Sequence, residues 1–183
     1  AANWNNILST DGGRTWNERV RGADITCFHD LRFVGDSVYA VAMDEGLFRS
    51  RDNGATWKQL IPLKYGAGLS GHQWRVFARE KADGTHHIVS TASPWRAAEE
   101  YPNLVLVSDD DGKTFTRAKG LPTYRPKPNT MWGEGYARAL AADPKNPDTL
   151  YLGIDGDPEP AKGLSGGGVF KSTDGGLNWT QLP

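Results

Sequence analysis

The fold is decided by the stretch Ser9-Thr10-Asp11-Gly12-Gly13-Arg14-Thr15-Trp16, because its pattern of Ser, Asp, Gly and an aromatic residue occurs four times. The pattern returns at 50–57, 108–115 and 172–179 with the same offsets. An Asp two residues before a Gly accepts hydrogen bonds from turn amides, and the Gly supplies the positive φ of a tight reversal. The aromatic residue then begins the return strand and offers an apolar face to a neighbouring unit. Each copy therefore predicts one β-hairpin of a repeat.

The shared positions of the four copies are expected to be structural. They are Ser9, Asp11, Gly13, Trp16, Ser50, Asp52, Gly54, Trp57, Ser108, Asp110, Gly112, Phe115, Ser172, Asp174, Gly176 and Trp179. This pattern resembles the Asp-box, or bacterial neuraminidase repeat, of β-propellers in sialidases, xyloglucan-cleaving glycoside hydrolases and sortilin-type Vps10 domains. The resemblance implies that each box joins the third and fourth strands of a blade and is not the active site.

The spacing of the boxes predicts the number of blades. Their serines lie 41, 58 and 64 residues apart, and the shortest spacing matches the roughly 40 to 50 residues of a four-stranded blade. We predict an all-β fold of three full four-stranded repeats preceded by half a blade, as part of a larger propeller. The units of this single segment, 1–183, are a half blade at 1–20 and blades at 21–61, 62–120 and 121–183. The alternative is an open repeat array that closes by assembling with other chains.

Alternation of apolar residues and turn signals places the strands within each unit. The first complete unit is expected to have strands at 25–34, 37–43, 46–50 and 56–60. The second is expected to have them at 75–80, 86–91, 104–108 and 114–119, and the third at 136–142, 149–154, 168–172 and 178–182. Residues 3–8 provide a third strand for the half blade.

Composition excludes several classes of partner. The 22 glycines and 7 tryptophans favour an all-β architecture, and 21 basic against 22 acidic side chains leave no electrostatic footprint for nucleic acid or an anionic membrane. No apolar run approaches the roughly 18 residues of a membrane span. The amino terminus lacks a leader, as expected of a secreted protein after leader removal and equally of an internal fragment. The resemblance implies an extracellular or periplasmic location.

Metal and cofactor sites are not predicted. Cys27 is the single cysteine, and a lone thiol in an alternating apolar segment is typical of a core residue. His86 and His87 are adjacent in a predicted strand, so their side chains point to opposite faces and cannot share one metal ion. The glycine-rich stretch 165–168 lacks the Lys and Ser or Thr of a phosphate-binding loop.

Long insertions indicate where function should lie. They fall at 62–73, 92–103, 121–134 and 155–167, all on the face opposite the Asp boxes. Aromatic rings beside charged groups suit a sugar, whose C–H faces stack on rings while its hydroxyls bind polar groups. The candidate substrate-binding residues are Trp95, Arg96, Tyr124, Arg125 and Trp132. For the two tryptophans, the alternative is that their rings cap the ends of the blades.

Glycoside cleavage needs two carboxyl groups about 5 to 9.5 Å apart. The candidate catalytic residues are Asp24, Glu134, Asp155 and Asp157, and no spacing rule selects a pair among them. The segment 24–30 is similar to the Gly-Asp-hydrophobic-small-Gly-Phe-His segment around a catalytic Asp in xyloglucan-cleaving enzymes. It departs from that segment at Ala23 and Cys27, where the pattern has Gly.

Two functions remain open from the sequence. The first is a secreted propeller segment that binds or processes glycans through the face opposite the boxes, as a glycoside hydrolase if it is an enzyme. The second is a non-catalytic scaffold or accessory subunit that binds a protein partner. In both cases further blades from the same or another chain are expected as partners.

Overall fold

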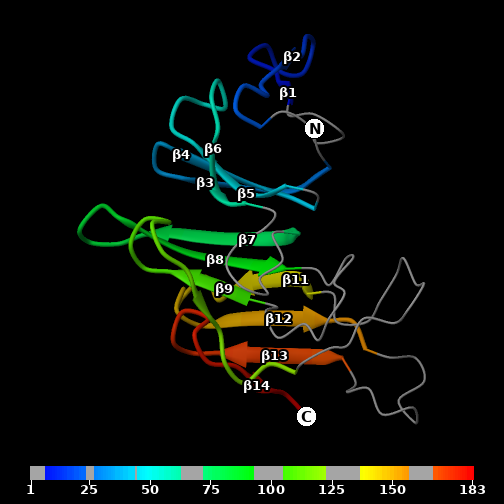
Figure 1. Ribbon diagram of the computed structural model, residues 1–183, viewed down its shortest axis with the longest axis vertical. Helices are drawn as coiled ribbons and strands as arrows, with labels where there is room; N and C mark the ends of the chain where they lie inside the picture. Colours follow the sequence, from blue (N-terminus) through cyan, green and yellow to red (C-terminus); the bar gives the residue numbers. More distant parts are fainter. Residues whose placement is uncertain are drawn as a thin grey trace.

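The computed structural model describes seven stretches of the chain: residues 7–23, 27–43, 45–62, 72–92, 105–122, 137–156 and 167–183. Within them the chain forms four antiparallel sheets, one of two strands and three of four strands, and no helix. The sheets follow one another along the molecule in the order of the sequence (Figure 1). The predicted all-β fold of four-stranded repeats is confirmed.

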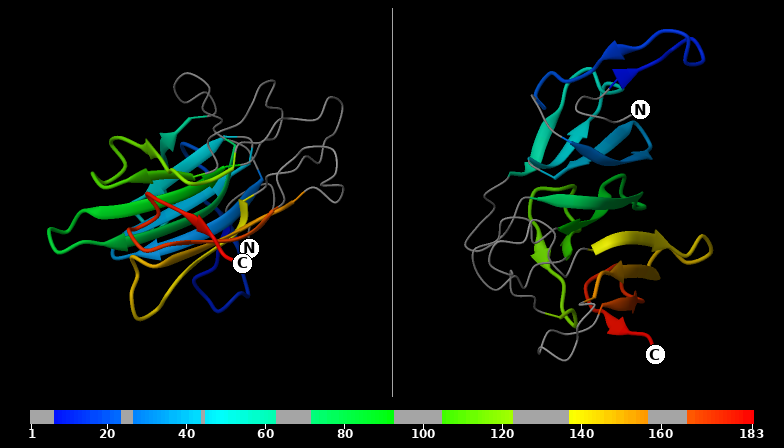
Figure 2. Two further views of the ribbon diagram at one scale, coloured as in Figure 1. Left: turned by 90° about the horizontal axis from the view of Figure 1, so that it is seen from below. Right: turned by 90° about the vertical axis from the view of Figure 1, so that its right-hand side faces the viewer.

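Each four-stranded sheet is a meander, in which strands that are consecutive in sequence are neighbours in space (Figure 2). The two-stranded half blade is β1 (Ile7–Leu8) and β2 (Asn17–Glu18). The first full blade is β3 (Phe28–Val34), β4 (Ser37–Ala42), β5 (Gly46–Ser50) and β6 (Lys58–Ile61). The second is β7 (Gln73–Glu80), β8 (His86–Ala92), β9 (Val105–Ser108) and β10 (Thr116–Arg117). The third is β11 (Ala137–Ala142), β12 (Leu150–Ile154), β13 (Gly168–Ser172) and β14 (Thr180–Gln181).

The second strand of a blade is buried on both faces when a sheet lies on each side of it. Every residue of β4 and of β8 is buried, and their runs of aromatic, β-branched and small residues suit such a position. In β12 of the last blade, buried and half-buried residues alternate. One face of β12 therefore packs on the preceding blade, and the other is partly open.

Each Asp box closes the hairpin between third and fourth strands with the same hydrogen bonds. In the second box, Ser50 Oγ donates to Asp52 Oδ1 at 2.7 Å and accepts from the Gly54 amide at 2.8 Å. The Asp52 carboxylate accepts from the amide of Thr56 at 2.8 Å and from its hydroxyl at 2.6 Å. These bonds, led by the Thr56 hydroxyl, lower the pKa of Asp52 to about 2.

Two consecutive residues with positive φ form the centre of every box. The pairs are Gly12 and Gly13, Asn53 and Gly54, Asp111 and Gly112, and Gly175 and Gly176. Positive φ at both central positions defines the type I′ turn, whose twist matches that of antiparallel strands. The sequence had indicated only the second of the two.

The fourth strands are shorter than predicted and begin one residue after the box aromatic. The Thr56 amide is bound to the carboxylate of its own box, and the Trp57 amide donates to the Arg21 carbonyl at 2.8 Å. Because both amides are already used, pairing with β5 starts at Lys58. The box thus delays the strand while tying it to the segment that precedes the blade.

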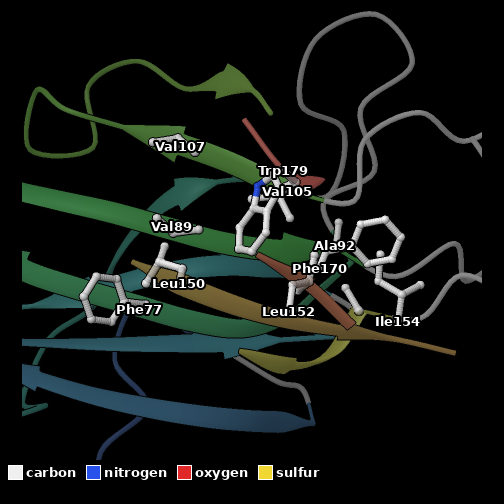
Figure 3. Close-up of a cluster of buried hydrophobic side chains, with 11 residues drawn as sticks. Phe77, Val89, Ala92, Val105, Val107, Leu150, Leu152, Ile154, Phe170 and Trp179 are labelled. Atoms are coloured by element: carbon white, nitrogen blue, oxygen red, sulfur yellow. The ribbon is translucent and has the colours of Figure 1, made fainter. Parts of the chain in front are cut away.

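Neighbouring blades bury apolar side chains against one another. Between the first two full blades, Tyr39 and Val41 of β4 share a cluster with Val76 and Ala78 of β7. Figure 3 shows the next interface, where residues of the last blade meet those of the second. Its members include Val89, Ala92, Val105, Val107, Leu150, Leu152, Ile154, Phe170 and Trp179.

The box aromatics differ in burial. Trp57 and Trp179 are 8% and 4% exposed, and Phe115 packs against the cluster between the first two full blades. Trp16 of the half blade is 49% exposed. The expected packing of the aromatic against a neighbouring unit is confirmed for Phe115 and Trp179, whose clusters include the preceding blade. Trp57 packs in a cluster of its own blade and reaches the half blade through its N–H, which donates to the Arg19 carbonyl.

Candidate functional site

The candidate site lies on the loop face, by which we mean the side where the first and third strands of each blade begin, opposite the Asp boxes. The first strands β3, β7 and β11 are neighbours, with β7 in the middle. Their first residues, Phe28, Gln73 and Ala137, therefore lie at one edge of the molecule. Among the described residues, this edge is built by the first strands of the blades.

Each first strand carries a β-bulge at its second residue. Phe28 pairs with Ala42 and Asp30 with Val41, so His29 is the extra residue. Trp74 has the same place in β7 and Arg138 in β11. A bulge re-aims a side chain and increases the local twist, and bulges are frequent beside active sites. We call His29, Trp74 and Arg138 the bulge row.

The side chains of the bulge row contact one another across the blades. The His29 ring is stacked on the Trp74 ring, with centroids 4.3 Å apart and planes 19° from parallel. The Arg138 guanidinium carbon lies 5.1 Å from the centroid of the same ring, within the range of a cation–π contact. Arg138 Nε also donates to Oδ2 of Asp155, the residue that follows β12.

Backbone contacts hold the bulges in place. Arg75 Nη1 donates to the carbonyl of Trp74 at 3.1 Å and to that of His29 at 3.3 Å. Both carboxylate oxygens of Asp30 accept backbone amides, from Leu31 at 3.0 Å and from Val76 at 3.2 Å. Asp30 is therefore engaged as a structural acceptor between two blades.

The second and third full blades are joined in the same way. The Thr91 hydroxyl donates to the carbonyl of Ala137 at 2.9 Å and accepts from the Arg75 amide at 3.0 Å. Ala137 immediately precedes Arg138, so this bond fixes the start of β11 beside β8. The bulge row is thus set on a rigid frame shared by three blades.

Exposure distinguishes the members that can reach a ligand. Trp74 is 7% exposed, whereas the side chains of Arg138 and Asp155 are 39% and 41% exposed. A buried aromatic ring therefore supports a guanidinium–carboxylate pair that is open to water. Such a pair offers both donors and acceptors to a polar ligand.

Among the predicted catalytic residues, Asp155 is the one that the structure describes. Asp24, Glu134 and Asp157 lie outside the described residues. The predicted substrate-binding residues also lie outside them: Trp95, Arg96, Tyr124, Arg125 and Trp132. Asp155 is paired with Arg138. The described part of the chain contains no second member of the predicted catalytic set.

Sequence reasoning did not select the bulge row. One signal was available, since Trp74 and Arg138 each precede the serine of the next Asp box by 34 residues. Equal distance from a fixed structural marker suggests equivalent positions in two blades. His29 breaks this spacing, because its blade has shorter loops.

Polar clusters on the opposite face have structural roles. Nδ1 of His86 is 2.6 Å from the Tyr39 hydroxyl of the preceding blade. Nδ1 of His87 is 2.6 Å from Oδ1 of Asp109, and Nε2 is 2.8 Å from the carbonyl oxygen of Gly175 in the next blade. The two histidines therefore join three blades and point apart.

The described residues contain no group of three or more His, Cys, Asp or Glu side chains placed to hold a metal ion. Nor does any described segment form a helix long and apolar enough to cross a membrane.

The family model of the BNR/Asp-box repeat matches residues 7–18. The chain is built from Asp-box propeller blades. It is similar in structure to an ancestral GH74 enzyme, with 18% identity over 96% of this chain and 21% of that one, and a TM-score of 0.63. A GH74 enzyme of Niastella koreensis gives 19% identity, coverage of 100% and 22%, and a TM-score of 0.59.

At these identities the similarity to the GH74 enzymes establishes the fold. The chain spans about a fifth of the length of the two solved structures. Comparison with curated proteins gives no match.

Proposed function

We propose that this Asp-box segment binds or processes glycans through its loop face. The observation that supports the proposal most is the Arg138–Asp155 pair, which the bulge row holds in a partly exposed position. Sugar hydroxyls both donate and accept hydrogen bonds, and they match a guanidinium beside a carboxylate. The shared fold of the GH74 glycoside hydrolases agrees with this chemistry.

The residues of the site divide into two roles. Arg138 and Asp155 bind sugar hydroxyls directly. Trp74 and His29 are positioning residues, since the stacked rings fix the place of the Arg138 guanidinium. The loop residues Trp95, Arg96, Tyr124, Arg125 and Trp132 remain proposed substrate contacts.

Processing would require a second acid. Asp155 would act as one carboxyl group of a glycosidase pair, and Asp24, Glu134 and Asp157 are the proposed partners. One group would protonate the leaving oxygen, and the other would act as base or nucleophile. Single substitution of Glu134, Asp155 and Asp157 distinguishes an enzyme from a binding protein, because loss of turnover with an intact fold supports catalysis.

The test is a binding and turnover screen of the intact 183-residue chain against plant and sialylated oligosaccharides. We expect Arg138→Ala and Asp155→Asn each to weaken binding at least about tenfold, as hydrogen bonds to charged groups are lost. Arg79→Ala is the matched control, because Arg79 of the second full blade forms a similar partly exposed pair with Asp148 of the third at 2.5 Å, on the face of the Asp boxes. Absence of binding to the whole panel, or equal loss in the control, would refute the proposal.

A second candidate function is a scaffold that binds a protein partner. It is favoured by exposed apolar side chains on the first and third full blades, Phe33 at 72% and Val169 at 48%. A monomeric, partner-free protein with measurable hydrolase activity would argue against it.

The location and the division of the chain are also proposals. We place the protein outside the cytoplasm, extracellular or periplasmic, in keeping with a glycan ligand. We treat residues 1–183 as one propeller segment to which further blades are joined. Fractionation of the source cells followed by immunoblotting tests the first, and limited proteolysis tests the second.

A further inference from the structure

An apolar groove of about 250 Å³ lies between the half blade and the first full blade. Its apolar lining comes from Ile7 and Leu8 of β1, Leu31 and Phe33 of β3, and Val38 of β4, with Trp57 at one side. Phe33 is the most exposed large hydrophobic residue in the described part of the chain, at 72%. An aromatic side chain this exposed in a strand marks a surface that a partner can cover.

The equivalent residues of the next blade are buried. Counting from the bulge row, Leu31 corresponds to Val76 and Phe33 to Ala78. Val76 is 0% and Ala78 5% exposed, because they pack in one cluster with Tyr39 of β4. A first strand is therefore covered by the second strand of the preceding blade.

The half blade offers no such cover within the described residues. The first Asp box lies between β1 and β2, so these strands correspond to the third and fourth strands of a full blade. In the three full blades the third strand pairs with both its neighbours, whereas in the described part of the chain β1 pairs with β2 alone. An apolar face and an unpaired strand edge thus meet in the same groove, the combination that β-strand addition uses.

We propose that this groove binds a β-hairpin that acts as the first and second strands of the amino-terminal blade. One strand of the hairpin pairs antiparallel with β1, as β4 pairs with β5. Its alternate apolar side chains cover Leu31 and Phe33, as Tyr39 and Val41 cover the next first strand. The donor is a segment outside these 183 residues, because β3 and β4 of a second copy are already paired in their own blade.

The probe is a synthetic peptide of residues 27–43, since its two strands fill the equivalent place one blade further on. Binding to the intact chain is measured by fluorescence anisotropy and by titration calorimetry. We expect 1:1 binding. Phe33→Glu in the chain, with the peptide unchanged, should weaken this binding by about 10- to 100-fold, the range for loss of one buried aromatic contact. The same peptide with Tyr39→Ser and Val41→Ser is expected not to bind.

Val169→Glu in the chain is the matched control. Val169 is also an exposed apolar strand residue, at 48%, but it lies in the last blade. Both substituted side chains are on the surface, so far-UV circular dichroism and melting should match the unsubstituted chain. Retained peptide affinity in Val169→Glu, with loss in Phe33→Glu, supports the proposal.

Three results would overturn it. The first is absence of peptide binding, and the second is equal binding of the peptide with both serine substitutions. The third is a concentration-dependent dimer abolished by Phe33→Glu and Val169→Glu alike, which would mean that a second copy, joined head to tail, occupies the groove. Analytical ultracentrifugation separates this third outcome from hairpin binding. None of these measurements involves a glycan, so they are independent of the function proposed for the loop face.

Discussion

Replacing Trp57 with Ala tests how much burial of the box aromatic stabilises the blade in which it packs. Trp57 is 8% exposed, and a tryptophan buries roughly 150 to 250 Å², which corresponds to about 4 to 6 kcal/mol at about 25 cal/mol per Å². Its indole N–H also donates to the Arg19 carbonyl at 2.7 Å. Replacement of a buried Phe or Trp by Ala costs about 3 to 5 kcal/mol, so we expect a loss of that size in the free energy of unfolding.

Trp16→Ala is the internal control for this substitution. Trp16 has the same place in the first box but is 49% exposed, and its N–H donates at 3.1 Å to Gly13 of its own turn. About half of the transfer term is absent, so we expect a loss of about 1.5 to 2.5 kcal/mol. Urea unfolding of both variants gives the midpoint and the slope. Equal losses at unchanged slope would show that burial does not determine how much the box aromatic stabilises the fold.

Three further predictions concern the boxes and turns. Ser50→Ala should lower the free energy of unfolding by about 1 to 3 kcal/mol, because the buried Gly54 amide loses its acceptor. Ser9→Ala is its control: the bond from Gly13 to Ser9 is exposed, so the loss in the same urea assay should be less than about 1 kcal/mol. Gly120→Ala places a Cβ 2.1 Å from the Trp179 carbonyl oxygen, and Gly84→Ala meets no atom within 4 Å at a similar positive φ. By thermal unfolding we therefore expect Gly84→Ala to lower the free energy of unfolding by roughly 1 to 2 kcal/mol and Gly120→Ala to lower it by more than about 3 kcal/mol. The folded-state pKa of Asp52, about 2, lies below its ordinary value of 3.8, so its stabilising effect is present above about pH 4 and is lost as pH falls through about 2. The melting temperature of the unsubstituted chain should approach that of Asp52→Asn over this window, and a constant difference would contradict the assignment.

The boxes could be predicted from the sequence because every interaction that defines them is local. Ser50, Asp52 and Gly54 lie within five residues, and their hydrogen bonds join positions two to four apart. Side-chain types at fixed short offsets therefore contain the full geometry. The strand meander followed from the same turns, and the predicted strand at 168–172 matches β13.

The bulge row could not be predicted in this way. A bulge is a property of register between two strands, and here each pairing beside a bulge joins residues at least 11 apart, such as Asp30 and Val41. His29, Trp74 and Arg138 share no residue type, so the sequence contains no common motif for them. Their contacts also join three blades, whose loops differ in length.

Chemistry separates the two faces more clearly than loop length does. On the box face, the polar groups of the boxes are used internally: the Asp52 carboxylate accepts turn hydrogen bonds, and Arg49 is 2.7 Å from the Asp111 carboxylate of the next blade. The Arg79–Asp148 pair on this face is also partly exposed, and it joins the second and third blades. A group that satisfies its neighbours in this way stabilises the fold and has little capacity left for a ligand. On the loop face, Arg138 and Asp155 keep about two-fifths of their side-chain surface open to water while a buried ring fixes their position. Fixed geometry with accessible donors and acceptors is what specific recognition of a polar ligand requires, and this contrast is why we assign the ligand to the loop face.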